Sequence, residues 1–500
     1  MKALYILLLS YLFLLTQSST TISFSSSGNG YTVSDNVVTI SSVGTYDLTT
    51  TETNKKIIVA SSCTLNLNSF SLINSGTLTP IIISSGKQVT LVLTGESTLT
   101  DSSSNENEGT IYLESSASLI ISGTGTLNIN PNKFMAINGT ESTSLTVNGG
   151  PTIKISSTST NAGGVYLRSA IIFNNVIFTY TCTNGENHAI DSEGIIKLIK
   201  GTYTINSGEG KGIQSENYLY IGEESGSDSD LTLNINTNNE GIEAKMIEIY
   251  SGNINIEAGE DGINAASSGT DCDETVQCSG TCACYIHYNG GNLYLTSGED
   301  GIDVNGDITI SGGQIIVFAA TSSENQPIDQ DGLLSITGGT ILAAGSSQMG
   351  GVNGETTQTA KTYTGTISSG AKLVASDSSN NEIISLTTPK AASFLYFNYK
   401  SSFTITIDGT EISLTDASQS QGGQGGPGGQ VGPGIPSDQT SSSDTTAQGN
   451  DNSDNNTQTS SSDTTAQDDD DDDDDVEIFQ SNGYFLKSLN IIFILVLFIF

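Results

Sequence analysis

Acidic side chains recur in a repeated phrase near the middle of the chain. The sequence reads GEDGINA at residues 259–265 and GEDGIDV at residues 298–304. If the two phrases occupy the same position in neighbouring structural repeats, their carboxylates lie side by side. Two unit charges about 4 Å apart repel by about 1 kcal/mol even in bulk water, so such a row needs a counter-cation, raised pKa values or side chains that splay apart. Carboxylate oxygens are ligands that calcium prefers, which makes calcium the first cation to consider.

These carboxylates belong to a repeat that runs through most of the chain. A dipeptide that usually ends in Ile recurs at intervals of 21 to 39 residues, starting at residues 189, 212, 241, 262, 301 and 327. Weaker members start at residues 80, 110, 136 and 164. In four of the repeats a second glycine follows 11 or 12 residues later, at Gly201, Gly252, Gly313 and Gly339. The stretches between the glycines alternate apolar and polar residues, which indicates short strands rather than helices.

A unit of about 22 residues with two or three short strands is typical of one coil of a parallel β-helix. Each coil cannot bury its apolar row alone, so coils stack and form a continuous interior. The sequence therefore predicts an all-β fold, a parallel β-helix of roughly ten coils over residues 19–417. A β-sandwich or a propeller is the rival, but paired hairpin turns are scarce.

The repeat gives the acidic residues a geometry. The Ile of each dipeptide points inward, so the next residue points outward. The outward column reads Asp191, Gln214, Glu243, Asn264, Asp303 and Asp329, and the residues before the dipeptides form a second column of Lys211, Glu240, Asp261, Asp300 and Gln326. Because coils stack about 4.8 Å apart, we expect Asp261 beside Asp300 and Asp303 beside Asp329.

Two groups in these columns have the oxygen-rich composition of calcium sites. One predicted site draws on Glu299, Asp300, Asp303, Asp329 and Asp331. The other draws on Glu240, Glu243 and Asp261. The alternative is a solvated acidic face whose side chains point apart.

Both ends of the chain have the patterns of targeting segments. Residues 1–18 have one Lys, a short apolar run and small polar residues, which predicts a secretory signal peptide. Residues 418–480 are rich in Gly, Ser, Thr and Asp and include eight consecutive aspartates, which predicts a disordered acidic stalk. Residues 481–500 join the small residues Ser481 and Asn482 to a hydrophobic tail, the pattern of a GPI-anchor signal. We expect an extracellular protein at the cell surface; a membrane helix from Tyr484 is the alternative.

Cysteines and glycosylation motifs fit a secreted route. Four of the six cysteines crowd into an insertion over residues 271–290, namely Cys272, Cys278, Cys282 and Cys284. In an oxidising compartment their spacing favours two local disulfides over a zinc site. Cys63 and Cys182 are either a long-range pair or buried thiols. N-glycosylation motifs occur at Asn138 and Asn455.

Several stretches resemble a known family. The phrases GEDGIDVNGDITISGG and QPIDQDGLLSITGGTILAAGSSQMG, the later SLTTPKAASFLYF and the trailing GGQGGPGGQ are similar to the clostridial-type carbohydrate-binding family with polysaccharide-lyase-like topology. The resemblance covers residues 184–432 and implies a right-handed parallel β-helix with bound calcium and affinity for cellulose and acidic polysaccharides. It implies that Asp261, Asp300, Asp303 and Asp329 are calcium ligands. The cysteine insertion, the long polar N-terminal coils and the anchored tail depart from the family.

Three functions are compatible with these features. We expect first a calcium-dependent binder of a uronate-containing polysaccharide, with Tyr285, Tyr288 and Tyr294 lining a groove beside the acidic columns. The second is a structural coat or adhesion protein, and the third a calcium-dependent polysaccharide lyase with Lys211 as its base. We favour binding over catalysis because acidic neighbours would hold Lys211 in an ion pair. The net charge of −38 argues against nucleic acid as a partner, and we expect a monomer.

Overall fold

The computed structural model describes residues 19–417, except for residues 104–107, 133, 183, 267–282, 348–351 and 353. All of them lie in the first of two compact units, residues 1–427. The predicted signal peptide, stalk, anchor signal and most of the cysteine insertion lie outside the described residues. No helix within the described part of the chain is long and apolar enough to cross a membrane.

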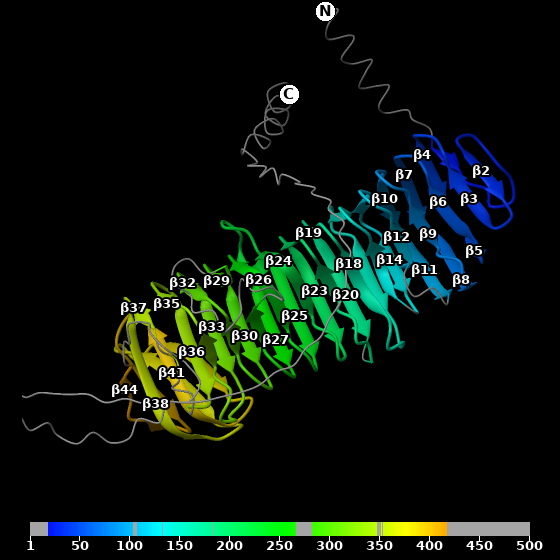
Figure 1. Ribbon diagram of the computed structural model, residues 1–500. Helices are drawn as coiled ribbons and strands as arrows, with labels where there is room; N and C mark the ends of the chain where they lie inside the picture. Colours follow the sequence, from blue (N-terminus) through cyan, green and yellow to red (C-terminus); the bar gives the residue numbers. More distant parts are fainter. Residues whose placement is uncertain are drawn as a thin grey trace, which may run out of the picture. The chain divides into compact units, whose positions relative to one another are not determined.

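The chain folds as a parallel β-solenoid of about twelve turns, in agreement with the predicted β-helix (Figure 1). Each turn carries three short strands, and each strand pairs in parallel with its counterpart in the next turn. We call the three stacks face 1, face 2 and face 3. The repeat alone predicts roughly ten turns, two fewer than the structure has, because the N-terminal turns lack the Gly-Ile signal.

Faces 1 and 2, together with the antiparallel strand β2 (Tyr31–Ser34), form a 25-stranded sheet. Face 1 consists of β3 (Val37–Ile40), β6 (Lys56–Val59), β9 (Ile81–Ile83), β12 (Ile111–Leu113), β15 (Met135–Gly139), β18 (Gly163–Leu167), β21 (Ile190–Ser192), the first halves of β24 (Ile213–Ile221) and β26 (Ile242–Ile249), β28 (Ile263–Ala265), β31 (Ile302–Val304) and β34 (Ile328–Gln330). Face 2 consists of β1 (Thr20–Thr21), β4 (Thr45–Leu48), β7 (Cys63–Asn68), β10 (Gln88–Thr94), β13 (Ser118–Gly123), β16 (Ser144–Val147), β19 (Ala170–Phe173), β22 (Ile195–Leu198), the second halves of β24 and β26, β29 (Tyr285–Tyr288), β32 (Asp307–Ile310), β35 (Leu334–Ile336) and β37 (Glu355–Thr356).

Face 3 forms the second sheet together with strands from the C-terminal end. Its parallel strands are β5 (Thr51–Thr53), β8 (Ser71–Gly76), β11 (Glu96–Ser103), β14 (Thr126–Asn130), β17 (Thr152–Ser156), β20 (Val176–Cys182), β23 (Gly201–Ser207), β25 (Leu231–Thr237), β27 (Asn253–Ala258), β30 (Asn292–Thr296), β33 (Gln314–Phe318) and β36 (Thr340–Gly345). The one helical element of the described residues is the 3-10 turn η1 (Asp228–Asp230) between β24 and β25.

The interior is a set of apolar columns, one from each face. On face 1 the inward column runs in unbroken register from Val38 of β3 to Ile328 of β34. Every member is at most 3% exposed. The column contains the Ile or Val of every dipeptide in the sequence repeat, so the predicted alignment is confirmed residue for residue.

Where the dipeptide begins with glycine, the chain turns so tightly from face 3 into face 1 that a side chain would not fit. A Cβ on Gly301 would lie 2.3 Å from Cγ1 of Val317 and 2.4 Å from the carbonyl oxygen of Pro327 in the next turn. The second glycine of the repeat serves a different purpose. Gly252 has φ of +121°, a backbone conformation that other residues rarely adopt, at the entry to β27.

The stack is closed by antiparallel strands at both ends. At the N-terminal end β2 (Tyr31–Ser34) pairs antiparallel with β3. At the C-terminal end β41 (Ala392–Tyr399) covers the edge of β36 and pairs with β38 (Thr359–Ile367), which pairs with β44 (Thr415–Asp416). A four-stranded sheet follows the order β40 (Glu382–Thr387), β39 (Lys372–Asp377), β42 (Phe403–Ile407) and β43 (Thr410–Glu411). These strands have their own apolar cluster against β33 and β36.

Candidate functional site

The two acidic columns stand side by side on face 1. The outward column follows the predicted register from Asp191 through Gln214, Glu243, Asn264 and Asp303 to Asp329. The column before the dipeptides stacks through its backbone, since the amide of each dipeptide glycine donates to the carbonyl of the column residue in the next turn, as Gly241 does to Asp261 and Gly262 to Asp300. The parallel strands thus hold both rows of side chains at the spacing of the coils.

Within the second column, side chains reach along the stack to backbone amides. The amide of Asp300 donates to Oδ1 of Asp261 at 2.8 Å, and the amide of Gln326 donates to Oδ1 of Asp300. The same contact occurs upstream, where the amide of Lys211 donates to Nδ1 of His188 at 2.9 Å. His188 therefore belongs to this column, although the sequence alignment began it at Lys211. Burial, with the nearby charge of Lys211, lowers the pKa of His188 to about 4.

The carboxylates at the C-terminal end of the columns crowd one another. Burial, together with the charges of Asp261, Asp300 and Asp329, raises the pKa of Asp303 to about 8. Burial and the neighbouring Asp300 raise the pKa of Asp261 to about 7. Burial also raises the pKa of Asp300, to about 6, and that of Asp329. None of the ion pairs between described residues involves these four aspartates, which we call the aspartate cluster.

The other predicted group has a cation from the protein itself. Nζ of Lys211 lies 2.9 Å from Oε2 of Glu240 and also contacts Oε2 of Glu243. All three side chains are mostly buried, with 15–20% exposed. The ion pair expected for Lys211 is therefore present, and two of the three carboxylates of the second predicted calcium site face its ammonium group.

The side chains of the described residues do not converge on a metal geometry. No group of three or more His, Cys, Asp or Glu side chains in the described ranges is arranged to hold a metal ion. In the aspartate cluster, Asp261 and Asp300 point toward backbone amides. Glu299 and Asp331 are exposed beside the cluster. Calcium binding by these residues stays a prediction.

The three tyrosines predicted to line one groove are separated by the fold. Tyr288 is a core residue, only 2% exposed, so its ring faces the interior. The prediction that Tyr288 lines a surface groove is therefore wrong. Tyr294 lies on face 3, packed against the C-terminal apolar cluster. Only Tyr285 is on the outward side of the sheet that carries the acidic columns, on face 2. Tyr285 and Tyr288 are three residues apart in one strand, and side chains alternate along a strand, so the two rings point to opposite sides of the sheet.

Tyr285 instead joins aromatic residues that the sequence analysis did not single out. We call the outward residues Tyr218, Tyr220, Tyr250, Tyr285 and His287 the aromatic cluster. The rings of Tyr220 and Tyr250 are 4.9 Å apart, and those of Tyr285 and His287 are 4.2 Å apart. Tyr220 of β24 pairs in register with Glu248 of β26, and Glu248 pairs with His287 of β29. The dipeptide repeat does not align these residues, because the register of β24 shifts between Ser215 and Tyr218 and the cysteine insertion separates β28 from β29.

Comparison with known proteins identifies a family for this chain. A family model described as carbohydrate-binding domain-containing protein matches residues 34–227 and again residues 227–471. The chain belongs to this carbohydrate-binding domain family. No curated protein and no solved structure matches.

The two matches to the carbohydrate-binding family meet inside a continuous stack. Residue 227 is the N-cap of η1, in the turn between β24 and β25. On either side of it the coils continue to pair, as β23 does with β25 on face 3. The aspartate cluster lies wholly in the second match, whereas the aromatic cluster draws on both.

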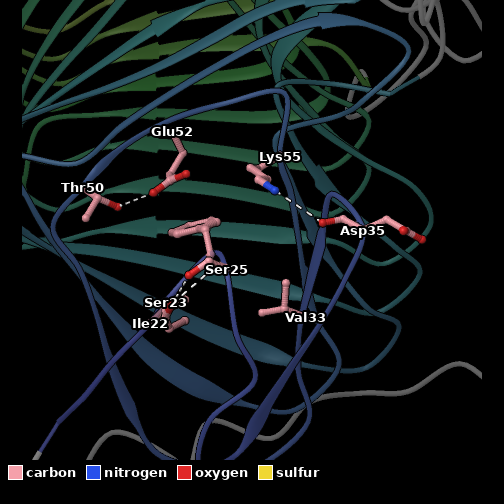
Figure 2. Close-up of a pocket in the computed structure, with 9 residues that line it drawn as sticks. Ile22, Ser23, Ser25, Val33, Asp35, Thr50, Glu52 and Lys55 are labelled. Atoms are coloured by element: carbon pink, nitrogen blue, oxygen red, sulfur yellow. Dashed lines mark hydrogen bonds between the residues drawn. The ribbon is translucent and has the colours of Figure 1, made fainter.

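A pocket lies away from both groups, at the N-terminal end of the stack. Figure 2 shows its lining, in which Lys55 bonds to the carbonyl of Asp35 and Thr50 to Glu52. None of the predicted site residues lines it, and its drawn polar groups are largely paired with one another.

Two further predictions concern modified residues. Asn138 lies in β15 on face 1 and is 6% exposed, which leaves no room for a glycan in the folded chain; this prediction is corrected. Asn455 lies outside the described residues.

Cys63 and Cys182 are not bonded to each other and are thiols, half-buried and buried respectively. Cys284 is buried, but Cys272, Cys278 and Cys282 lie outside the described residues, so the local disulfides stay a prediction.

Proposed function

We propose that this chain is a calcium-dependent carbohydrate-binding protein that recognises a carboxylated polysaccharide. The observation that carries the proposal is the aspartate cluster, a row of neighbouring carboxylates on the outward side of a carbohydrate-binding family member. Like charges so placed favour a bound cation. A calcium ion held there can offer an open coordination position to the carboxylate of a uronate unit, which the acidic surface alone would repel.

The donor chemistry of the cluster fits calcium. Asp303 and Asp329 are direct neighbours in register, and the exposed Glu299 and Asp331 add oxygen ligands at the rim. Calcium takes six to eight oxygens in flexible geometry, so carboxylates from successive turns suit it better than they suit a small octahedral cation. Glu240 and Glu243 fit less well because Lys211 already neutralises them.

No observation favours the lyase. An ammonium group held between two carboxylates has no free lone pair with which to take a proton, so Lys211 is poorly placed as a base. A coat or adhesion protein remains as an outcome of the binding test. The signal-peptide and GPI-anchor patterns support an extracellular location at the cell surface.

The test is calorimetric titration of polygalacturonate into the folded protein, with calcium and with chelator. We expect saturable heat with calcium only. The variant Asp303→Asn should reduce the affinity at least tenfold, because it removes the most crowded carboxylate. Glu257→Gln on face 3 is the matched control, since it removes one exposed outward carboxylate elsewhere. Absence of heat in both buffers from folded protein would contradict the proposal and favour a coat protein, and steady turnover would favour the lyase.

A further inference from the structure

The aromatic cluster is built around one carboxylate. The hydroxyl of Tyr250 donates to Oε2 of Glu248 at 2.5 Å, and the hydroxyl of Tyr218 donates to the same carboxylate. Nδ1 of His287 lies 3.6 Å from Oε1 of Glu248. The side chain of Glu248 is 16% exposed, whereas that of His287 is 41% exposed. Glu248 therefore forms the floor of the cluster, and the rings surround it at the surface.

Glu248 keeps its negative charge. Burial works against the charged form, but hydrogen bonds from Tyr250 and Tyr218 and the charge of His287 lower the pKa of Glu248 below its ordinary value. The hydroxyls that stabilise the carboxylate are neutral, so they leave its charge in place. A charge of this kind, framed by tyrosine rings, attracts cations and repels uronates.

The chain itself shows that an ammonium group suits these rings. Nζ of Lys197 lies 5.6 Å from the centre of the Tyr220 ring, on the strand before it in register. An ammonium group over an aromatic ring is attracted by the ring quadrupole, and aromatic cages are a recurrent way of binding such groups. The other tyrosines of the cluster offer further ring surface around Glu248.

We propose that the aromatic cluster is a second binding site of this chain, which takes a free amino group of a glycan, such as that of a glucosamine unit. The inference rests on the proposed function only in taking the ligand to be a carbohydrate. It is separate in position and chemistry, because the aspartate cluster is on face 1 and would hold a carboxylated sugar through a cation. The cluster lies in β24, β26 and β29 and the residue after β26, on face 2 of the same sheet.

The test compares two tetrasaccharides by calorimetry in chelator, one of glucosamine and one of N-acetylglucosamine. We expect the glucosamine tetramer to bind at least tenfold more tightly, because acetylation removes the positive charge. Glu248→Gln and Tyr220→Ala should each reduce its affinity at least tenfold. Two matched controls should bind as the unaltered chain does: Glu257→Gln, which removes one exposed carboxylate from face 3, and Tyr112→Ala, which removes one outward ring from face 1.

Each alternative outcome overturns the inference in a distinct way. Equal binding of the two tetramers would show that the amino group is not recognised. Equal losses in Glu248→Gln and Glu257→Gln would show general attraction of cations to an acidic protein. Loss of polygalacturonate binding leaves this site untouched, so the proposed function and this inference fail or stand separately.

Discussion

Asp191 is the outward carboxylate at the N-terminal end of the acidic column, five turns before Asp329. Burial, together with the charges of Glu216 and Glu193, raises its pKa to about 7. The folded chain therefore holds the proton of Asp191 at pH values where the unfolded chain has lost it. The contribution of Asp191 to the free energy of unfolding therefore falls as the pH rises from about 4 to about 7. Below that range Asp191 is protonated in both the folded and the unfolded state, so its contribution does not change with pH.

The direction of this pKa shift predicts how the variant Asp191→Asn changes stability. It should raise the free energy of unfolding at pH 8 by about 1–2 kcal/mol, a value reduced from the full shift because water reaches part of the side chain. At pH 3.5 the variant and the unaltered chain should unfold alike. Denaturant unfolding at both pH values measures the difference, and Glu257→Gln serves as control. A gain of equal size at both pH values would contradict the assigned cause.

Asn138 gives a second prediction at the residue scale. Its side chain lies between Tyr112 and Tyr166 in the outward column of face 1 and is 6% exposed. A glycan there would displace the neighbouring turns. Peptide mass spectrometry of the secreted protein should find Asn138 unmodified. A glycan on a large fraction of folded chains would show that this part of face 1 is more open than the structure has it.

At the scale of the element, alternation along a strand separates core from surface. In β32, Ile308 is 1% exposed in the interior, whereas the next residue, Thr309, points outward. Ile308→Ala should lower the free energy of unfolding by about 2–4 kcal/mol, because it leaves a cavity that stacked coils cannot close. Thr309→Ala should change it by less than about 1 kcal/mol. Denaturant unfolding of the two variants provides the measurement, and similar losses would contradict this orientation of β32.

At the scale of the whole molecule, the C-terminal antiparallel strands protect the end of the stack. β41 covers the edge of β36, and Phe318 and Leu342 are buried beneath the C-terminal cluster. A chain that ends at Ser346 would expose both an unpaired strand and this apolar surface, so it should aggregate. A chain that ends at Ala417 retains the strands and should stay monodisperse. Light scattering compares the two, and a monodisperse shorter chain would show that β36 needs no cover.

The amino-acid sequence by itself determined the solenoid and its register. The Ile or Val of each dipeptide must be buried and the glycine before it must fit a tight turn, so the repeat fixes which residue faces inward on every coil. With that column fixed, the alternation of side chains along each strand and the stacking of coils predict from the sequence alone that Asp303 lies beside Asp329 and Asp261 beside Asp300. Local chemistry and short-range periodicity carry this information.

Only the tertiary structure decided which side chains share a surface across the turns. The rings of Tyr220, Tyr250 and Tyr285 come from three coils whose loops differ in length, so linear spacing does not bring them together. The same folding sends Tyr288 into the core and Tyr294 to face 3. The partner of Lys211 was also decided by stacking, because Glu240 and Glu243 lie one coil away and meet its ammonium group only when the coils are in register.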